Sequence, residues 1–581
     1  MKPIALLIAG VVEGLLLGCG GGSGGPGNQG NAGSGVADIS LPAATLGPDL
    51  MGVVNSTQWV ANGGSTLAYD SVNQGFPFTT DASGNTNHED WQKSIRSPMV
   101  NLLAGHAYQF VARMKADVFP RGQNLVFTVR DAGDSTQFSQ YAWNVSRAGV
   151  WEEVYMTVFP TTTGNWRLDV WVSPTIKYTT TPSMVFIAPD VDVYELPVGQ
   201  EVATLHGVNV AADKDAFVSS TQRIDGLGNV YVLQNGSWKH VFPRMMYKGV
   251  YSTVADRAEL FRRYKEYGFT GVMDIWAASE AQALIDAGLE HISINANYAN
   301  TVDMANYLDQ VDGWATTNSR QQNVLWYNYD NENASVADYD YQQVLQAYID
   351  AHHQDPQTGK RRHPIYFLNG QVGLPRTCHN AGRSVMDITG SYVGSLAALG
   401  ETAHIPPVPT LLTQFMTQNQ RAPVTVIQLQ TYLNEGFIPS LFYGLITGGR
   451  AISVWRDGST QSFVKPDFRD NVWAPAFRDD VSPKLDQMLP IIEQPHFTTW
   501  KAWTNQFPYV RIGTRELNGT GYLILANFGV TDLPVVVSLQ GRQATKALDM
   551  FTGAAIADVV NGSFQFTLGH YNSGYRVIRL M

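Results

Sequence analysis

The first long part of the chain alternates apolar and polar residues with a period of two. The alternation is clear at residues 108–115, 125–129 and 168–172, and turn-forming residues separate these runs. Successive side chains of a strand point to opposite faces, so this alternation predicts one buried face and one solvent-exposed face. We therefore expect residues 37–198 to form an antiparallel β-sandwich.

Residues 199–499 change to strand–helix alternation. After a β-rich lead-in with an Asn235-Gly236 turn, runs typical of strands occur at residues 248–251, 271–275, 291–295, 324–329, 364–368, 385–389, 424–429 and 451–455. Apolar spacing predicts helices at residues 255–267 and 341–352. Two further helices are expected, one capped by Ser279 that ends before Gly288, and one that starts at Ser482. Eight such units predict a (β/α)₈ (TIM) barrel. A doubly wound sheet is the alternative, but the first strand is not followed by a glycine-rich phosphate loop.

The last part of the chain returns to a period of two. Residues 522–527, 564–568 and 576–580 have the pattern of strands. We expect a small C-terminal β-sandwich over residues 500–581. It resembles the β-sandwich that often closes glycoside hydrolase barrels.

The N-terminal segment predicts export and a lipid anchor. Lys2 precedes an apolar run over residues 4–17, which is too short to span a bilayer. The run ends in Leu17-Gly18-Cys19, which resembles the bacterial lipobox, and the resemblance implies that residues 1–19 are a signal peptide and that Cys19 carries the lipids. Glu13 departs from the pattern, and an ordinary signal peptide is the alternative. Residues 20–36 are rich in glycine and predict a flexible linker.

If Cys19 is lipidated, we expect the protein in the cell envelope, at the outer membrane or the cell surface, with the lipid as its contact with the membrane. No later run of 18 apolar residues occurs. The net charge is −11, without a long basic run, which argues against a phosphate-tracking nucleic-acid binder. If Cys19 is lipidated, Cys378, the other of two cysteines, has no partner for an intrachain disulfide. No metal or nucleotide motif occurs, so we expect no metal and no cofactor, and we expect a monomer.

The N-terminal sandwich resembles carbohydrate-binding modules of the jelly-roll type. The resemblance rests on residues 103–108, 149–153 and 190–194, and it implies binding to a polysaccharide or an oligosaccharide. Aromatic rings can stack on the apolar faces of sugars, and the segment holds Trp59, Trp91, Trp143, Trp166 and Trp171. Most of these indoles are also explained as core residues. Trp171 alternates out of phase with its apolar neighbours and is the better candidate for exposure.

In a (β/α)₈ barrel, catalytic groups lie at the C-terminal ends of the strands. The run at residues 324–329 is followed by Asp330-Asn331-Glu332. Here the barrel resembles the large clan of (β/α)₈ glycoside hydrolases in which an Asn-Glu pair ends strand four. The resemblance implies that Glu332 is the general acid/base and that Asn331 contacts a sugar hydroxyl. A solvated acidic turn is the alternative interpretation.

The same clan places a nucleophilic glutamate at the end of strand seven, and this sequence departs from that pattern. The end of the run at residues 424–429 holds glutamines, Gln428 and the following Gln430, and Glu435 lies five residues beyond. Glu435 is either the second catalytic carboxylate or a residue that favours a helix terminus, and Asp330 is a further choice. Among other strand-end residues, Asp274 and Asp387 are candidate substrate contacts. Aromatic side chains that could form a sugar subsite are Trp276, Trp326, Tyr392, Tyr432 and Trp455.

These observations lead to a surface-anchored glycoside hydrolase that cleaves a polysaccharide by carboxylate acid/base catalysis. The main alternative is a non-catalytic glycan-binding lipoprotein with a degenerate barrel. A barrel with lyase or transglycosylase activity is the third. The fold alone does not choose among them.

Overall fold

A computed structural model describes much of the chain. It covers residues 39–40, 48–63, 67–80, 94–106, 108–116, 125–134, 137–141, 149, 151–158, 160, 162–172, 183–195, 209–210, 215–248, 254–296, 301–329, 336–369, 379–380, 383–384, 387–392, 424–430, 436–455, 473–496, 498–506 and 509–581.

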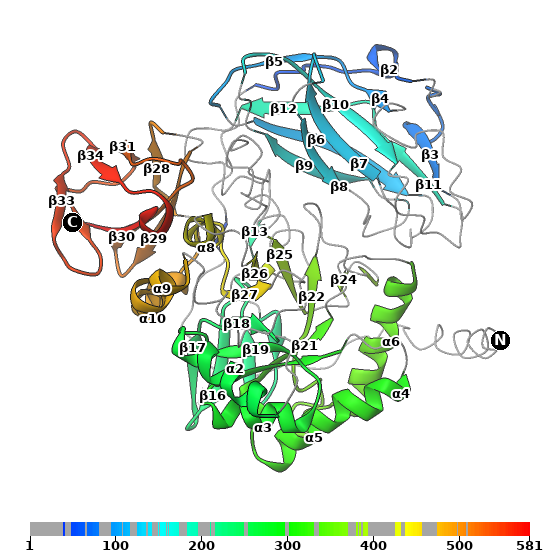
Figure 1. The fold of residues 1–581 in the computed structure, drawn as a ribbon. Helices are drawn as coiled ribbons and strands as arrows, with labels where there is room; N and C mark the ends of the chain where they lie inside the picture. Colours follow the sequence, from blue (N-terminus) through cyan, green and yellow to red (C-terminus); the bar gives the residue numbers. More distant parts are fainter. Residues whose placement is uncertain are drawn as a thin grey trace. The chain divides into compact units, whose positions relative to one another are not determined.

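Two antiparallel sheets form the N-terminal part (Figure 1). The first has the order β2 (Val60–Ala61), β4 (Ile95–Arg96), β10 (Gly164–Val172), β7 (Leu125–Asp131) and β8 (Gln137–Tyr141), with β5 (Val100–Leu102) also on β10. The second has the order β12 (Asp192–Glu195), β6 (Tyr108–Ala116), β11 (Ser183–Ile187) and β3 (Phe76–Thr80), with β9 (Glu152–Val158) on β6. The alternation therefore predicted the strands correctly, and the jelly-roll assignment stays a prediction.

The tryptophans of these sheets differ in burial. Trp59 and Trp166 are buried in the core, so they are packing residues. Trp171 is half-buried, and its Nε1 donates a hydrogen bond to Thr128 Oγ1 over 3.0 Å. This agrees with its out-of-phase position on β10. Trp91 and Trp143 lie outside the described residues.

A four-stranded antiparallel sheet precedes the barrel. Its strands are β14 (Phe217–Val218), β15 (Gln222–Ile224), β16 (Val230–Gln234) and β17 (Ser237–Val241). Asn235 and Gly236 join the last two strands with φ of 51° and 76°, as a two-residue hairpin turn requires. The sheet packs against the side chains inside the barrel. Gln222 Nε2 donates to the carbonyl of Leu325, near the start of a barrel strand, over 2.6 Å.

Eight parallel strands then close into a barrel, which confirms the fold expected for the central part. In order they are β18 (Arg244–Tyr247), β19 (Gly271–Ile275), β20 (His291–Asn295), β21 (Val324–Tyr329), β22 (Ile365–Asn369), β25 (Ile388–Tyr392), β26 (Val424–Gln430) and β27 (Ala451–Trp455), and β27 pairs with β18. Two predicted strands were misplaced. The first strand lies before residues 248–251, and the sixth begins at residue 388 rather than 385.

Helices and short elements connect the strands. They are α2 (Val254–Glu266), α3 (Ala278–Asp286), α4 (Thr301–Asp303), η3 (Met304–Leu308), α5 (Asp309–Thr317), η4 (Gln321–Asn323), α6 (Val336–His352), β23 (His379–Asn380), β24 (Arg383–Ser384), α8 (Phe437–Ile446), α9 (Trp473–Ala476), η8 (Phe477–Val481) and α10 (Ser482–Ile492). The N-cap of α3 is Ala277 and makes no side-chain cap bond. The prediction of Ser279 as the cap was therefore wrong.

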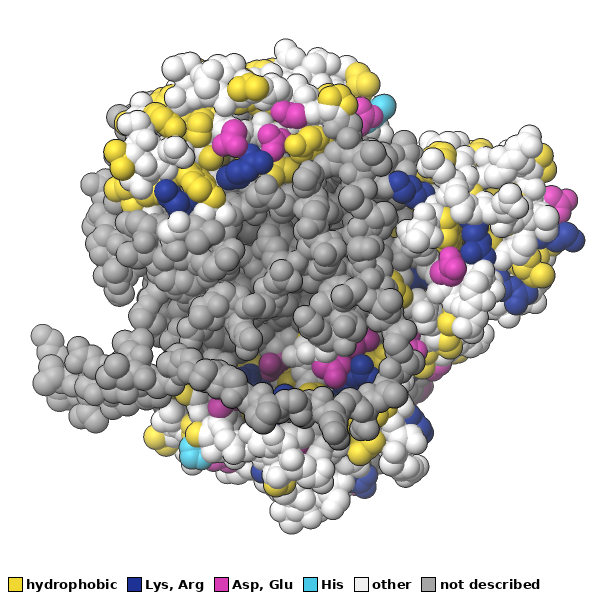
Figure 2. Space-filling view, turned by 180° about the vertical axis from the view of Figure 1, so that it is seen from behind, with side chains coloured by type: hydrophobic (Ala, Val, Ile, Leu, Met, Phe, Trp, Pro, Cys, Tyr) yellow, Lys and Arg dark blue, Asp and Glu magenta, His cyan; other side chains and the backbone are white. Residues whose placement is uncertain are grey.

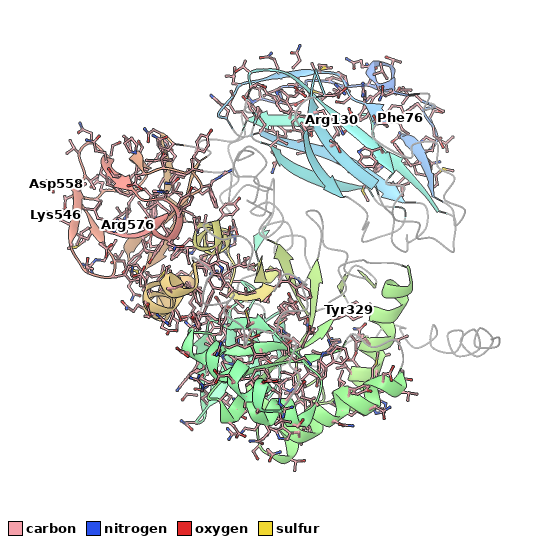
Figure 3. The ribbon with its side chains drawn as sticks, in the orientation of Figure 1. Phe76, Arg130, Tyr329, Lys546, Asp558 and Arg576 are labelled. Atoms are coloured by element: carbon pink, nitrogen blue, oxygen red, sulfur yellow. The ribbon has the colours of Figure 1, made fainter. Side chains whose placement is uncertain are left out.

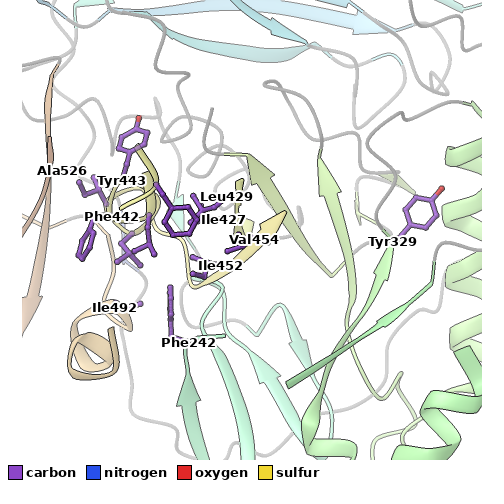
Figure 4. Close-up of a cluster of buried hydrophobic side chains, with 14 of the residues drawn as sticks. Phe242, Tyr329, Ile427, Leu429, Phe442, Tyr443, Ile452, Val454, Ile492 and Ala526 are labelled. Atoms are coloured by element: carbon purple, nitrogen blue, oxygen red, sulfur yellow. The ribbon is translucent and has the colours of Figure 1, made fainter. Parts of the chain in front are cut away.

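The outward faces of the barrel strands form the main core with these helices. Ile427 and Leu429 of β26, Ile452 and Val454 of β27, and Phe442 of α8 are all buried in one cluster (Figure 4). None of the described helices is both long enough and apolar enough to cross a membrane.

Two antiparallel sheets form the C-terminal part. One contains β28 (Lys501–Thr504), β31 (Leu533–Gln540) and β34 (Ser563–Leu568). The other contains β29 (Val510–Leu517), β30 (Thr520–Asn527), β35 (Tyr575–Leu580), β32 (Lys546–Asp549) and β33 (Ala555–Asp558). In the register of β32 and β33, Lys546 lies opposite Asp558 (Figure 3). Short elements outside the main sheets are β1 (Ile39–Ser40), β13 (Asn209–Val210), η1 (Ser56–Gln58) and η9 (Tyr571–Ser573).

The described surface carries charges of both signs. On the face in Figure 2, acidic and basic side chains lie interspersed among apolar and neutral polar ones. This arrangement agrees with the net charge of −11 and with a sequence that has no basic run.

Candidate functional site

The two ends of the barrel differ. The lead-in sheet packs at the end where the strands begin, as the bond from Gln222 to Leu325 shows. The C-terminal ends of the eight strands, which we call the barrel mouth, are the end at which parallel barrels carry their chemistry. A site built from residues of several strands should therefore be sought at the mouth.

Asp274 has an unusual backbone conformation at the mouth. It has φ of 63°, in the left-handed region that few residues other than glycine adopt. The pairing of β19 with β20 shifts register between Val272 and Ile275, which is the signature of a β-bulge. Such strain persists where surrounding contacts impose it, and it is common at functional sites.

Two amides hold the carboxylate of Asp274. Asn295 Nδ2 donates to its Oδ1 over 3.0 Å, and Asn328 Nδ2 donates to the same oxygen over 2.7 Å. The two asparagines are paired neighbours on β20 and β21, and both are buried. Among the described residues, both hydrogen bonds to this carboxylate fall on Oδ1, and Oδ2 accepts none from them. The side chain as a whole is half-buried rather than sealed.

Burial raises the pKa of Asp274, because a charged carboxylate loses its hydration there. The hydrogen bonds from Asn295 and Asn328 and the charge of Lys248 act against this rise, but they do not cancel it. Asp274 is thus a carboxyl group that is clamped at one oxygen and holds its proton to higher pH than an exposed aspartate.

A second polar group stands beside Asp274. Lys248 Nζ donates to both carboxylate oxygens of Glu280, over 3.1 and 3.2 Å. The backbone N–H of Trp276 donates to Glu280 Oε2 over 2.8 Å. Lys248 follows β18 directly, Trp276 follows β19, and Glu280 lies in the first turn of α3.

The wall of the barrel near the mouth is aromatic and amide-rich. Trp455, the last residue of β27, packs edge-on against Tyr247 with ring centroids 4.7 Å apart. Gln428 of β26 is buried and accepts a hydrogen bond from the hydroxyl of Ser453. Tyr392 is the last residue of β25, so its backbone lies at the mouth.

Two predicted site residues lie elsewhere. Asp387 precedes β25 and therefore lies at the opposite end of the barrel, where its Oδ2 accepts from Arg361 Nη1 and from the N–H of Ile365, both over 2.8 Å. It was predicted at a strand end because the strand was placed three residues too early. Trp326 lies in the middle of β21, fully buried, with its ring 5.5 Å from that of Tyr366. It fills the barrel interior and cannot line a surface subsite.

Other predicted residues fall outside the described part of the chain. These are Cys19, Asp330, Asn331, Glu332, Tyr432 and Glu435, and also Cys378. Sequence reasoning missed Lys248, Glu280, Asn295 and Asn328 as site residues. The asparagines carried a signal, since Asn295 is the last residue of β20 and Asn328 is the last but one of β21. Within the described ranges, no group of three or more His, Cys, Asp or Glu side chains is arranged to hold a metal ion.

Comparison with known structures gives distant likenesses. No protein-family model matches the chain, and no curated protein matches its sequence. An Anoxybacillus alpha-amylase structure is 10% identical over 58% of this chain and 97% of its own, with a TM-score of 0.39. A GH30 endoxylanase from Clostridium papyrosolvens is 11% identical over 59% and 97%, with a TM-score of 0.32.

A smaller structure, titled for CBM4 structure and function, is 12% identical over 24% of this chain and 95% of its own. Its TM-score is 0.18. Because these scores are low, the fold assignment rests on the strand order described above and not on the likenesses.

Proposed function

We propose that this protein is a glycoside hydrolase that cleaves a polysaccharide at the barrel mouth. The observation that carries the proposal is the clamped carboxyl of Asp274, held through Oδ1 by Asn295 and Asn328 at the functional end of a closed barrel. Its Oδ2 is suited to accept a hydrogen bond from a sugar hydroxyl. An exposed indole beside it, Trp276, adds the apolar surface that a sugar face needs.

In this proposal, Glu332 is the general acid. It comes three residues after Tyr329, the last residue of β21, and Asn328 of the same strand already belongs to the clamp. The second carboxylate is Glu435 or Asp330, and Asn331 contacts the sugar. Cys19 anchors the chain to the cell envelope through lipid, and the N-terminal sheets hold the polymer.

Release of reducing sugar from soluble starch, xylan, mixed-linkage β-glucan and mannan tests this function. Glu332→Gln keeps the shape of the side chain but removes its proton, so turnover of the polymer should fall about 10²- to 10⁴-fold. Nitrophenyl glycosides should suffer much less, because their leaving group needs no protonation. If Glu332→Gln turns over the polymer normally, the acid is another residue.

One observation favours a non-catalytic glycan-binding protein instead. The strand that carries the nucleophile in the resembling clan here holds Gln428, whose Oε1 is engaged by Ser453 of the next strand. An amide cannot act as a nucleophilic carboxylate. Retention of the intact protein on one of the four polysaccharides, without release of sugar from any of them, would decide for this alternative.

A further inference from the structure

Trp276 is held in place at the mouth by a short connection to α3 and by two contacts. Only one residue separates it from the start of α3, so the connection is short. Its backbone N–H is fixed by Glu280 Oε2 at 2.8 Å. The ammonium of Lys248, itself bound to both oxygens of Glu280, lies 5.2 Å from the centroid of the indole.

The indole nevertheless stays open to solvent. Trp276 is 42% exposed, whereas Glu280 is 7% exposed. A cation close to the ring of a tryptophan is attracted by the π-system and restrains the ring. A buried carboxylate is thus used to hold an exposed apolar ring, which packing alone does not require. Holding an aromatic ring in advance lowers the entropy lost when a ligand stacks on it.

We propose that Trp276 is a stacking platform for a sugar ring and that Lys248 and Glu280 are the positioning residues that hold it. Glu280 neutralises the charge of Lys248, so the platform suits an uncharged sugar rather than a uronic acid. This inference rests on the proposed function for its ligand class, and it names the subsite beside Asp274.

Oxidation of exposed indoles by N-bromosuccinimide, mapped by peptide mass spectrometry on the full chain, tests the platform. The probes are the hexasaccharides of starch, xylan, mixed-linkage β-glucan and mannan. Trp238 of β17 is a matched internal control, because it is 41% exposed and lies in the lead-in sheet at the other end of the barrel. We expect at least one hexasaccharide to slow oxidation of Trp276 several-fold and to leave Trp238 unchanged. If none protects Trp276, the platform is overturned.

Three variants test the positioning. Glu280→Ala removes both contacts, and Glu280→Gln keeps an acceptor for the N–H of Trp276, so the glutamine should rescue part of the protection. Lys248→Met removes the cation and keeps the stem, which serves if Glu280→Ala does not fold. We expect KM to rise about tenfold in Lys248→Met, with kcat little changed. Wild-type protection in both Lys248→Met and Glu280→Gln would overturn the positioning role.

The outcomes separate this inference from the proposed function. Protection of Trp276 without any release of sugar would support the platform and contradict hydrolysis. Hydrolysis without protection of Trp276 by a hexasaccharide of the hydrolysed polymer would support the enzyme and overturn the platform.

Discussion

Asn328 donates a hydrogen bond from Nδ2 to Asp274 Oδ1 over 2.7 Å, across 54 positions of sequence. The bond joins β21 to the bulged end of β19, and it fixes one oxygen of a carboxyl group at the barrel mouth. Replacing Asp274 with Asn removes the charge and keeps a residue type that tolerates a positive φ. The fold should therefore survive, so a change in activity reports on the site.

We expect Asp274→Asn to lower kcat/KM on the hydrolysed polymer about 10- to 100-fold, the usual worth of a hydrogen bond to a charged group. Asp387→Asn is the matched control, since Asp387 is also a half-buried aspartate beside a barrel strand but lies at the opposite end of the barrel. That variant should lose stability and keep its kcat/KM per folded molecule. Equal activity losses in both variants would contradict the placement of the site.

The raised pKa of Asp274 also makes a prediction about stability. A carboxyl group whose pKa is higher in the folded than in the unfolded state binds more protons when folded, so it lowers stability as pH rises above the unfolded value of about 3.9. As the pH rises above about 3.9, the wild type should therefore lose unfolding free energy relative to Asp274→Asn. Urea unfolding at several pH values measures it, and a constant difference would contradict the shift.

Asp312 behaves in the opposite way. Burial alone would raise its pKa, but the hydrogen bond from His353 and the charges of His363, His353 and Arg362 lower the pKa to about 2. Its stabilising contribution is therefore present above about pH 3.9 and is lost as the pH falls through about 2. We expect Asp312→Asn to cost about 3 kcal/mol at neutral pH, because it leaves buried partners without their charge. The gap to the wild type in urea unfolding should narrow in acid.

Lipidation of Cys19 is a prediction of the sequence. The apolar run over residues 4–17 and the Leu17-Gly18-Cys19 segment motivate it. Mass spectrometry of the mature N-terminus from a bacterial host should find cleavage before Cys19 and added acyl chains. Cleavage elsewhere, with an unmodified Cys19, would be consistent with an ordinary signal peptide.

The N-terminal sheets provide a further test. We expect residues 37–198 to fold alone, because both sheets form from strands within this range, and to bind the polymer that the full chain binds. Affinity electrophoresis in gels that contain each polysaccharide measures this. A folded fragment that is not retarded by a polymer that retards the full chain would show that the sheets are structural.

The sequence predicted the barrel strands best where an apolar run has clear borders. The ranges 271–275, 291–295, 324–329 and 451–455 match β19, β20, β21 and β27. The first strand was misplaced because residues 248–251 were taken for it, whereas β18 covers the four residues before them, Arg244–Tyr247. The same kind of error, three residues at β25, moved Asp387 to the wrong end of the barrel.

The clamp on Asp274 could not be predicted from the sequence. It requires the bulge between Val272 and Ile275 and the pairing of Asn295 with Asn328, which are properties of three strands in register. Local patterns report which face a residue takes, but they do not report which distant residue meets it. The link between Lys248 and Glu280 was missed for the same reason, since 32 positions separate them.

The sheet of β14 to β17 sets the N-terminal boundary of any fragment in which this barrel can be expressed on its own. Its apolar residues Phe217, Ile224 and Val232 share a core with side chains inside the barrel, and Arg450 bonds back to the carbonyl of Leu227 over 3.4 Å. A fragment that starts at the first barrel strand would expose this apolar floor to water and leave the guanidinium without that acceptor. The smallest expression unit for grafting the barrel onto another module therefore starts before residue 215, and a fusion joint at residue 242 would invite aggregation.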